Sequence, residues 1–167
     1  MARLENLLGV HALALVDRMT QATASSDSAA LVTVLAHPGQ GVGWLADVLG
    51  LTDSGGTRLV ERLVADGLLV RGAGADARSR VLRLTPAGRR RARQLLAERE
   101  RELAAALDPL SEVEKRSLER LLAKVVSGLT DDRATALRAC RLCDRDACAA
   151  GAHRCPLEHT VPPGALP

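Results

Sequence analysis

Apolar residues recur every three or four positions through most of the chain, which is the spacing of helices that bury one face. The first such run contains Leu4, Leu7, Leu8, His11, Leu15 and Met19. A second helix is expected from a polar start at 25–27 to about 37, and a third over 42–49. Thr52 is a suitable N-cap for a fourth helix that ends near Asp66, where Gly67 can terminate it.

Two short apolar runs interrupt this helical pattern. Residues 68–71 and 80–84 predict strands, and the glycine-rich residues 72–76 predict a hairpin tip between them. Thr85 is expected to cap a long helix with Pro86 in its first turn, and Asp108 marks its end. Ser111 and Glu114 predict a capping box at the start of another helix, which runs to about 129. The expected fold is therefore mainly α with a small β-hairpin.

Composition and charge narrow the class of protein. Hydrophobic residues make up 47% of the chain, which contains one Trp and no Phe or Tyr, so the core must be aliphatic. Aliphatic cores suit helices packed on helices. The net charge is only +3, but residues 52–93 contain ten arginines and four acidic residues. A basic block between near-neutral segments is typical of nucleic-acid binding.

Two short helices joined by a turn and followed by a hairpin describe a winged helix-turn-helix. Its second helix enters the major groove of DNA, so its exposed positions need small polar residues and arginine. The hairpin arginines can reach phosphates or the minor groove. Leu59, Val60, Leu63 and Val64 are expected to face the core. The candidate DNA contacts are Thr52, Ser54, Gly55, Thr57, Arg58 and Arg62 in the helix, and Arg78 and Arg80 in the hairpin.

The wing has a distinctive sequence pattern. Asp76-Ala77-Arg78 is followed after five residues by Leu84-Thr85-Pro86-Ala87-Gly88, and residues 45–52, 58–63 and 66–69 fit the same pattern upstream. Over residues 4–129 the chain resembles the MarR family of bacterial regulators. The resemblance implies a homodimer held by the first and last helices, a palindromic double-stranded DNA operator, and repression relieved by a small molecule or by oxidation. It also implies that Asp76 orients the wing and that Arg78 enters the minor groove.

Gly55 and Gly56 depart from the family pattern. Each glycine destabilises a helix interior by about 1 kcal/mol relative to alanine. A structural reason would be that small residues let this helix approach DNA or a neighbouring helix closely.

All four cysteines lie in a polar C-terminal tail, at Cys140, Cys143, Cys148 and Cys155. Thiolates clustered at this spacing are typical of a tetrahedral zinc site, and Arg138, Arg141, Arg145 and Arg154 could offset its negative charge. Asp144 and His153 are alternative ligands. An iron-sulfur cluster, a thiol-disulfide switch and unligated thiols are the competing interpretations. Residues 130–132 should cap a short helix leading to Cys140, and we expect the folded tail to lie against the dimerisation helices.

These observations divide the chain into three parts. Residues 1–24 and 107–130 form a helical dimerisation region, 25–106 a winged helix-turn-helix with a long linking helix, and 131–167 a Cys-rich metal-binding tail. No segment contains the roughly 20 apolar residues of a membrane span, so a cytoplasmic protein is expected. A protein-interaction adaptor would not need arginines on both helix and wing. An enzyme is not expected, because the cysteines can all be used as ligands and no catalytic constellation is evident.

Overall fold

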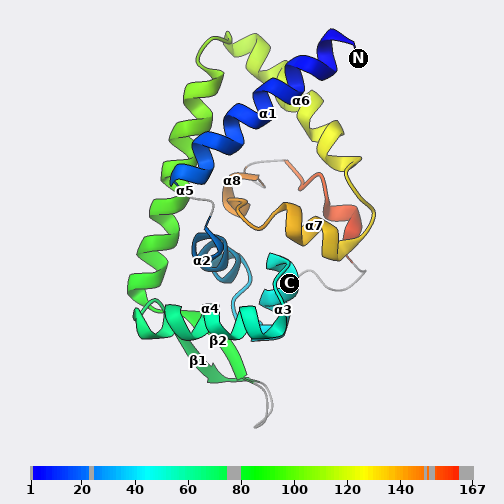
Figure 1. Ribbon diagram of the computed structural model, residues 1–167. Coiled ribbons are helices and arrows are strands. Elements are labelled where there is room, and N and C mark those ends of the chain that lie inside the picture. The colour runs from blue at the N-terminus through cyan, green and yellow to red at the C-terminus, as the bar shows by residue number, and fades with distance from the viewer. Residues whose placement is uncertain (1, 23–24, 75–79, 149, 151–152, 162–167) are drawn as a thin grey trace.

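The computed structural model describes residues 2–22, 25–74, 80–148, 150 and 153–161. Most of these residues are helical, and the predicted order of four helices, a hairpin and two helices is confirmed (Figure 1). The tail adds two short helices and a 3-10 turn. The elements are α1 (Arg3–Ala22), α2 (Ser26–Ala36), α3 (Val42–Leu49), α4 (Asp53–Ala65), β1 (Leu69–Ala73), β2 (Arg80–Leu84), α5 (Pro86–Leu107), α6 (Glu112–Ser127), α7 (Arg133–Ala139), α8 (Arg145–Cys148) and η1 (Glu158–Thr160).

The helices begin at the polar residues that the sequence indicated. The hydroxyl of Thr52 accepts a hydrogen bond from the backbone N–H of Gly55 at the start of α4. Ser111 and Glu114 form the predicted capping box of α6, and the carboxylate of Asp132 caps α7. These side chains satisfy backbone donors that a helix terminus leaves unpaired.

The core lies where α2, α3, α4, the hairpin and the first half of α5 pack together. We call α2, α3, α4 and the β1–β2 hairpin the reading head. The buried side chains of the whole core, α5 included, are aliphatic, as expected from the composition. They are Leu31, Val32, Val34, Leu45, Leu59, Val60, Leu63, Leu69, Leu82, Leu84, Ala92 and Leu95. The expectation that Val64 faces this core is wrong, because its side chain is exposed. The ring of Trp44 packs at the edge of the core, 5.3 Å from that of His37.

Two glycines allow close packing around α4 and the hairpin. A Cβ atom on Gly56 would lie 2.6 Å from the Cβ of Ala46, so Gly56 lets α4 pack directly on α3. A Cβ on Gly88 would overlap the carbonyl oxygen of Leu68, where α5 begins beside β1. The close approach that was expected of the glycine pair is thus seen at Gly56, where α4 contacts the neighbouring helix α3.

The hairpin is antiparallel, with Leu69 opposite Leu84 and Ala73 opposite Arg80. Thr85 fixes its base, because the Thr85 hydroxyl donates to the carbonyl of Gly67 at 2.7 Å and accepts from the N–H of Gly88 at 3.0 Å. Among the described residues, no helix is long and apolar enough to cross a membrane.

Candidate DNA-reading surface and cysteine cluster

The N-terminal half of α4 presents the predicted polar residues to solvent. Thr52, Ser54, Thr57 and Arg58 are exposed, and Gly55 is partly exposed beside them. Leu59, Val60 and Leu63 on the opposite side are buried, so the core fixes the rotation of the helix about its axis. α4 therefore presents a polar face that includes the exposed Arg58 near its N-terminus, the end with which recognition helices of this class contact base edges.

Arg62 has a protein partner that the sequence did not reveal. Its guanidinium forms a two-pronged ion pair with Asp27 in the first turn of α2, at 2.6 Å and 3.2 Å. Both side chains remain partly exposed. The structure thus gives Arg62 a role in holding α4 against α2, and its contact with DNA stays a prediction.

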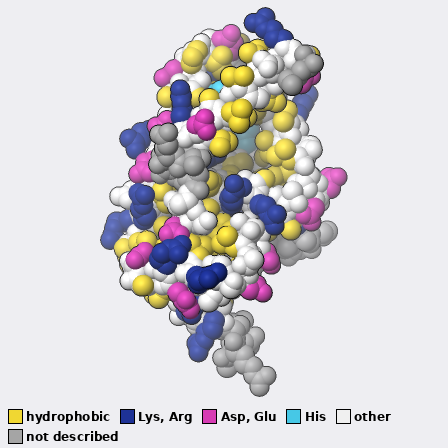
Figure 2. Space-filling model, in the orientation of Figure 1, with side chains coloured by type: hydrophobic (Ala, Val, Ile, Leu, Met, Phe, Trp, Pro, Cys, Tyr) yellow, Lys and Arg dark blue, Asp and Glu magenta, His cyan; other side chains and the backbone are white. Residues whose placement is uncertain are grey.

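The hairpin adds basic side chains next to α4. Arg80 begins β2 and is exposed, as are Arg71 and Arg83, which the sequence analysis did not single out. Arg71 and Arg83 lie in the two predicted strands, and this position was the signal from which they could have been identified as candidates. Asp76 and Arg78 lie outside the described residues. In Figure 2, Lys and Arg side chains are spread over the visible face, and some of them lie, with acidic neighbours, in the lower part where Figure 1 places α4 and the hairpin.

The helices at the other end carry exposed apolar side chains. Within α6, which is described throughout, no residue is buried. Hydrophobic side chains gather over α1 and α6 in the upper part of Figure 2. Contiguous apolar surface of this kind marks an interaction site. The side chains are 46–75% exposed, at Leu4, Leu7, Leu8, Val10 and Leu13 of α1 and at Val113, Leu121, Leu122, Val125 and Leu129 in and next to α6.

The tail folds back onto the reading head. The Thr33 hydroxyl of α2 donates to the carbonyl of Arg141, and the guanidinium of Arg145 donates to the carbonyl of Ala36, each at 3.2 Å. Arg138 donates to the carbonyl of Asp47 in α3 at 3.2 Å, and Leu142 packs against the core. α3 consequently lies between α7 and α4 (Figure 1).

This arrangement corrects the expectation that the tail lies against the dimerisation helices. Residues 138–145 make their apolar and backbone contacts with α2 and α3, because the side chain of Leu142 packs against the core there. The tail meets the α6 region through polar contacts. His153 lies 3.8 Å from Glu119, and His159 lies 3.2 Å from the carbonyl oxygen of Thr130.

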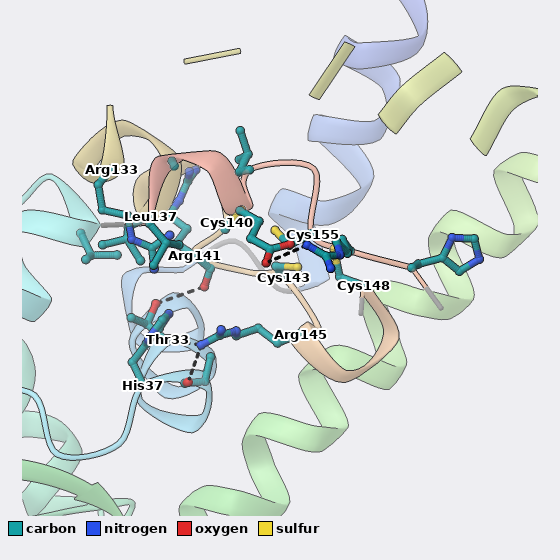
Figure 3. Close-up of a pocket in the computed structure, with 18 residues that line it drawn as sticks. Thr33, His37, Arg133, Leu137, Cys140, Arg141, Cys143, Arg145, Cys148 and Cys155 are labelled. Atoms are coloured by element: carbon teal, nitrogen blue, oxygen red, sulfur yellow. Dashed lines mark hydrogen bonds and ion pairs between the residues drawn. The ribbon is translucent and has the colours of Figure 1, made fainter. Parts of the chain in front are cut away.

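The four thiols come together in this folded tail. Cys140 directly follows α7 as its C-cap, Cys148 ends α8, and all four cysteines are free and partly buried. The thiol of Cys143 donates to the backbone carbonyl of Asp144 at 3.4 Å, and all four cysteines line one cavity. Figure 3 shows the four labelled cysteines close together among the residues that line this cavity.

The electrostatics distinguish the thiols of the cluster. The hydrogen bond from Cys143, with the positive charges of Arg133 and Arg145, lowers the pKa of Cys140 to about 6. The same hydrogen bond and burial raise the pKa of the Cys143 thiol above its ordinary value. The Cys140–Cys143 pair therefore favours one thiolate that is stabilised by the neighbouring thiol and by the two arginines.

The cavity lies between the tail and the reading head and has a volume of about 320 Å³. Its walls come from α2, α3, α7 and residues 153–161, and include Arg133, Arg141, Arg145 and Arg154. Arg141, Arg145 and Arg154 are three of the four arginines that the sequence predicted near the cysteines. The fourth residue in the cavity wall is Arg133, whereas the predicted Arg138 is not among the lining residues. The expected alternative ligands lie nearby: His153 lines the cavity, whereas the carboxylate of Asp144 caps α8.

His37 stands on the reading-head side of the same cavity. Burial, with the charges of Arg145 and Arg133, lowers its pKa to about 4, so the ring is neutral near neutral pH. Among the described residues, no three His, Cys, Asp or Glu side chains are arranged to hold a metal ion.

Comparison with known proteins identifies the fold. Residues 14–79 match the sequence profile of the MarR family. No curated protein sequence matches the chain significantly. A MarR family protein from Bacillus stearothermophilus is 30% identical, with 73% of this chain and 89% of that chain covered and a TM-score of 0.65.

Two further solved structures agree. The PcaV transcriptional regulator from Streptomyces coelicolor is 27% identical, with 74% and 95% of the two chains covered and a TM-score of 0.55. MepR, a transcription regulator of the Staphylococcus aureus multidrug efflux pump MepA, shares the fold at 19% identity, with 78% and 100% covered and a TM-score of 0.65. The chain belongs to the MarR family of transcriptional regulators.

Proposed function

We propose that the protein is a homodimeric repressor that binds a palindromic DNA operator. The observation that carries the proposal is the rigid, solvent-facing polar side of α4 beside the exposed arginines of the hairpin. Thr57 and Arg58 lie on the exposed side, and the buried Leu59 and Leu63 fix the helix in that orientation. Such a helix would read base edges in the major groove while hairpin arginines contact phosphates or the minor groove.

The proposed dimer is supported by the apolar faces of α1 and α6. Leu7 and Leu8 in α1, and Leu121 and Leu122 in α6, are exposed in the single chain. Pairing two chains through these helices would remove the faces from water, and each Å² of apolar surface buried contributes roughly 25 cal/mol. A two-fold dimer presents two reading heads, which matches a palindromic operator.

The tail belongs to the same proposal as a site that is structural or that senses metal or redox state. A zinc ion is the favoured occupant, and an iron-sulfur cluster or a disulfide between two of the thiols are the alternatives. An effector acting here would be a metal, an oxidant or a small molecule. An adaptor that binds another protein is the second candidate function. Such a protein would not need phosphate-matching arginines on both α4 and the hairpin.

The first test is a gel-shift series with the intact protein and DNA fragments from its own genome. We expect one or a few fragments that contain an inverted repeat to be retarded at much lower protein concentration than the rest. Arg58→Ala should weaken this binding about tenfold or more, because a good arginine–base contact contributes roughly 1–3 kcal/mol. Arg101→Ala, an exposed arginine of α5, is the charge-matched control and should bind normally. Equal retardation of all fragments would contradict the proposal.

A further inference from the structure

The cavity between the tail and the reading head combines an excess of arginines with an aliphatic wall. We infer that it binds a small aliphatic carboxylate, whose acidic group lies among the arginines and whose chain lies on the apolar wall. Most of the lining residues lie within 133–161, outside the part of the chain that matches the family profile. The pocket goes beyond DNA binding, and its effect on operator affinity rests on the proposed function.

The walls of the cavity carry more positive than negative charge. Four arginines line it, and Glu158 is the one carboxylate among the described lining residues. Of the four, only Arg154 forms an ion pair within the described part of the chain, with Glu158 at 3.9 Å. A zinc ion bound by four thiolates carries two negative charges, so even an occupied cysteine cluster would leave the cavity positive. A half-enclosed site with one sign of charge in excess attracts a ligand of the opposite sign.

Two of the arginines act at the same place in the cavity. The guanidinium of Arg145 donates to the carbonyl of Ala36 at 3.2 Å and lies 3.4 Å from Nδ1 of His37. Burial, and then the charges of Arg145 and Arg133, lower the pKa of His37, so both guanidinium groups lie near this ring. Figure 3 shows Arg133 on the α7 side and Arg145 beside α2. A carboxylate between them would accept charge-assisted hydrogen bonds from both, which are stronger than those between neutral groups.

Aliphatic side chains form much of the remaining wall. Val48 of α3, Leu137 of α7, Leu157 and Val161 line the cavity, and Leu157 is buried. Contact with this wall would remove the CH₂ groups of a ligand from water. The volume of about 320 Å³ is at the small end of the range for ligand pockets. It holds roughly ten non-hydrogen atoms at about 30 Å³ each, which fits a straight-chain carboxylate such as octanoate.

A ligand in this cavity would contact the reading head and the tail together. Thr33 and Val48 belong to α2 and α3, whereas Arg133 and Leu137 belong to α7 in the tail. The tail also reaches the segment that follows α6, because His159 lies 3.2 Å from the carbonyl oxygen of Thr130. Binding would therefore hold the tail on the reading head and restrict movement of the head relative to α6. In a dimer paired through α1 and α6, this restriction acts on the spacing of the two reading heads.

The first test is calorimetric titration of the full-length protein with octanoate, 1-octanol and acetate, in the absence of DNA. Octanoate should bind at one site per chain, and the other two at least tenfold more weakly, because octanol lacks the charge and acetate lacks the chain. Arg133→Gln should weaken octanoate binding about fivefold or more. Arg101→Gln, at an exposed arginine of α5, is the matched control and should bind as the wild type does. Equal binding of octanoate and octanol, or unchanged binding by Arg133→Gln, would overturn the pocket.

The second test locates the ligand by hydrogen–deuterium exchange, again without DNA. Octanoate should slow exchange in the last turn of α2 and in α7, and should leave the β1–β2 hairpin unchanged. Leu137→Trp fills the cavity while keeping all four arginines, so it should lose both the binding and the slower exchange. Octanoate that binds without protecting α2 and α7 lies elsewhere, which would contradict the assignment. Neither readout involves DNA, so failure of the pocket and failure of the proposed DNA binding can be told apart.

Discussion

The hydroxyl of Thr33 donates a hydrogen bond to the backbone carbonyl of Arg141 at 3.2 Å, across 108 residues of sequence. Thr33 is buried in the first helix of the reading head, and Arg141 lies between the first two cysteines of the tail. The C-terminal segment of this regulator is thus attached to the part of the fold that is proposed to read DNA.

Thr33→Val keeps the shape of the side chain and removes this donor. The carbonyl of Arg141 would lose its partner, and we expect the free energy of unfolding to fall by about 1–2 kcal/mol. Thr57→Val makes the same change at an exposed position of α4 and should have little effect on stability. Urea unfolding of the three proteins measures the difference. Equal stability of both variants would show that the Thr33 bond contributes nothing to tail docking.

Leu122→Asp should separate the dimer into monomers. The side chain of Leu122 is 46% exposed in the single chain and would be buried against the partner, where an unpaired carboxylate is strongly disfavoured. Light scattering should give twice the chain mass for the wild type and the chain mass for this variant. Val70→Asp, equally exposed at 46% but on the hairpin, should remain a dimer. A monomeric wild type would refute the assignment of α1 and α6 to a dimer interface.

Gly88→Ala should be destabilising out of proportion to its size. The added Cβ overlaps the carbonyl of Leu68, so α5 and β1 must move apart, and overpacking of this kind typically reduces stability by about 1–3 kcal/mol. Gly43→Ala is the control: its Cβ meets no atom within 4 Å in α3, so the better helix former should stabilise the protein by up to about 1 kcal/mol. Thermal unfolding should therefore shift in opposite directions for the two variants.

Acid should destabilise the protein partly through His37. The folded-state pKa of His37 is about 4, below its ordinary 6.5, so between these values the unfolded chain binds a proton that the folded chain does not. The stability due to neutral His37 is thus complete above about pH 6.5 and is lost as the pH falls towards 4. In urea unfolding from pH 7 to 5, the wild type should lose more stability than His37→Gln. Parallel pH curves for wild type and His37→Gln would contradict this.

The sequence was sufficient for the helices, the hairpin and the exposed polar side of α4. Thr52, Ser111 and their partners carry local capping signals, and local patterns of this kind do not depend on distant contacts. The buried side of α4 was also predictable from its apolar spacing, apart from Val64, which lies beyond the end of the packed stripe.

The position of the tail and the partner of Arg62 were not predictable in this way. Both depend on pairs far apart in sequence: Thr33 with Arg141, and Asp27 with Arg62. Neither pair leaves a periodic signal, and a polar segment such as 138–148 gives few apolar positions from which a docking face could be inferred. In the structure, the side chain of Leu142 packs against the core and so identifies the docked face of the tail.

The most direct test of the central claim is selection of duplexes from a random DNA pool by the intact dimer, followed by titration of the enriched sequence at several salt concentrations. The account predicts an inverted repeat with half-sites about 10 base pairs apart, and affinity that falls steeply as salt rises, because arginine–phosphate contacts release counterions. A pool that shows no enriched sequence, with binding that does not change with salt, would contradict the assignment of α4 and the hairpin as a DNA-reading surface.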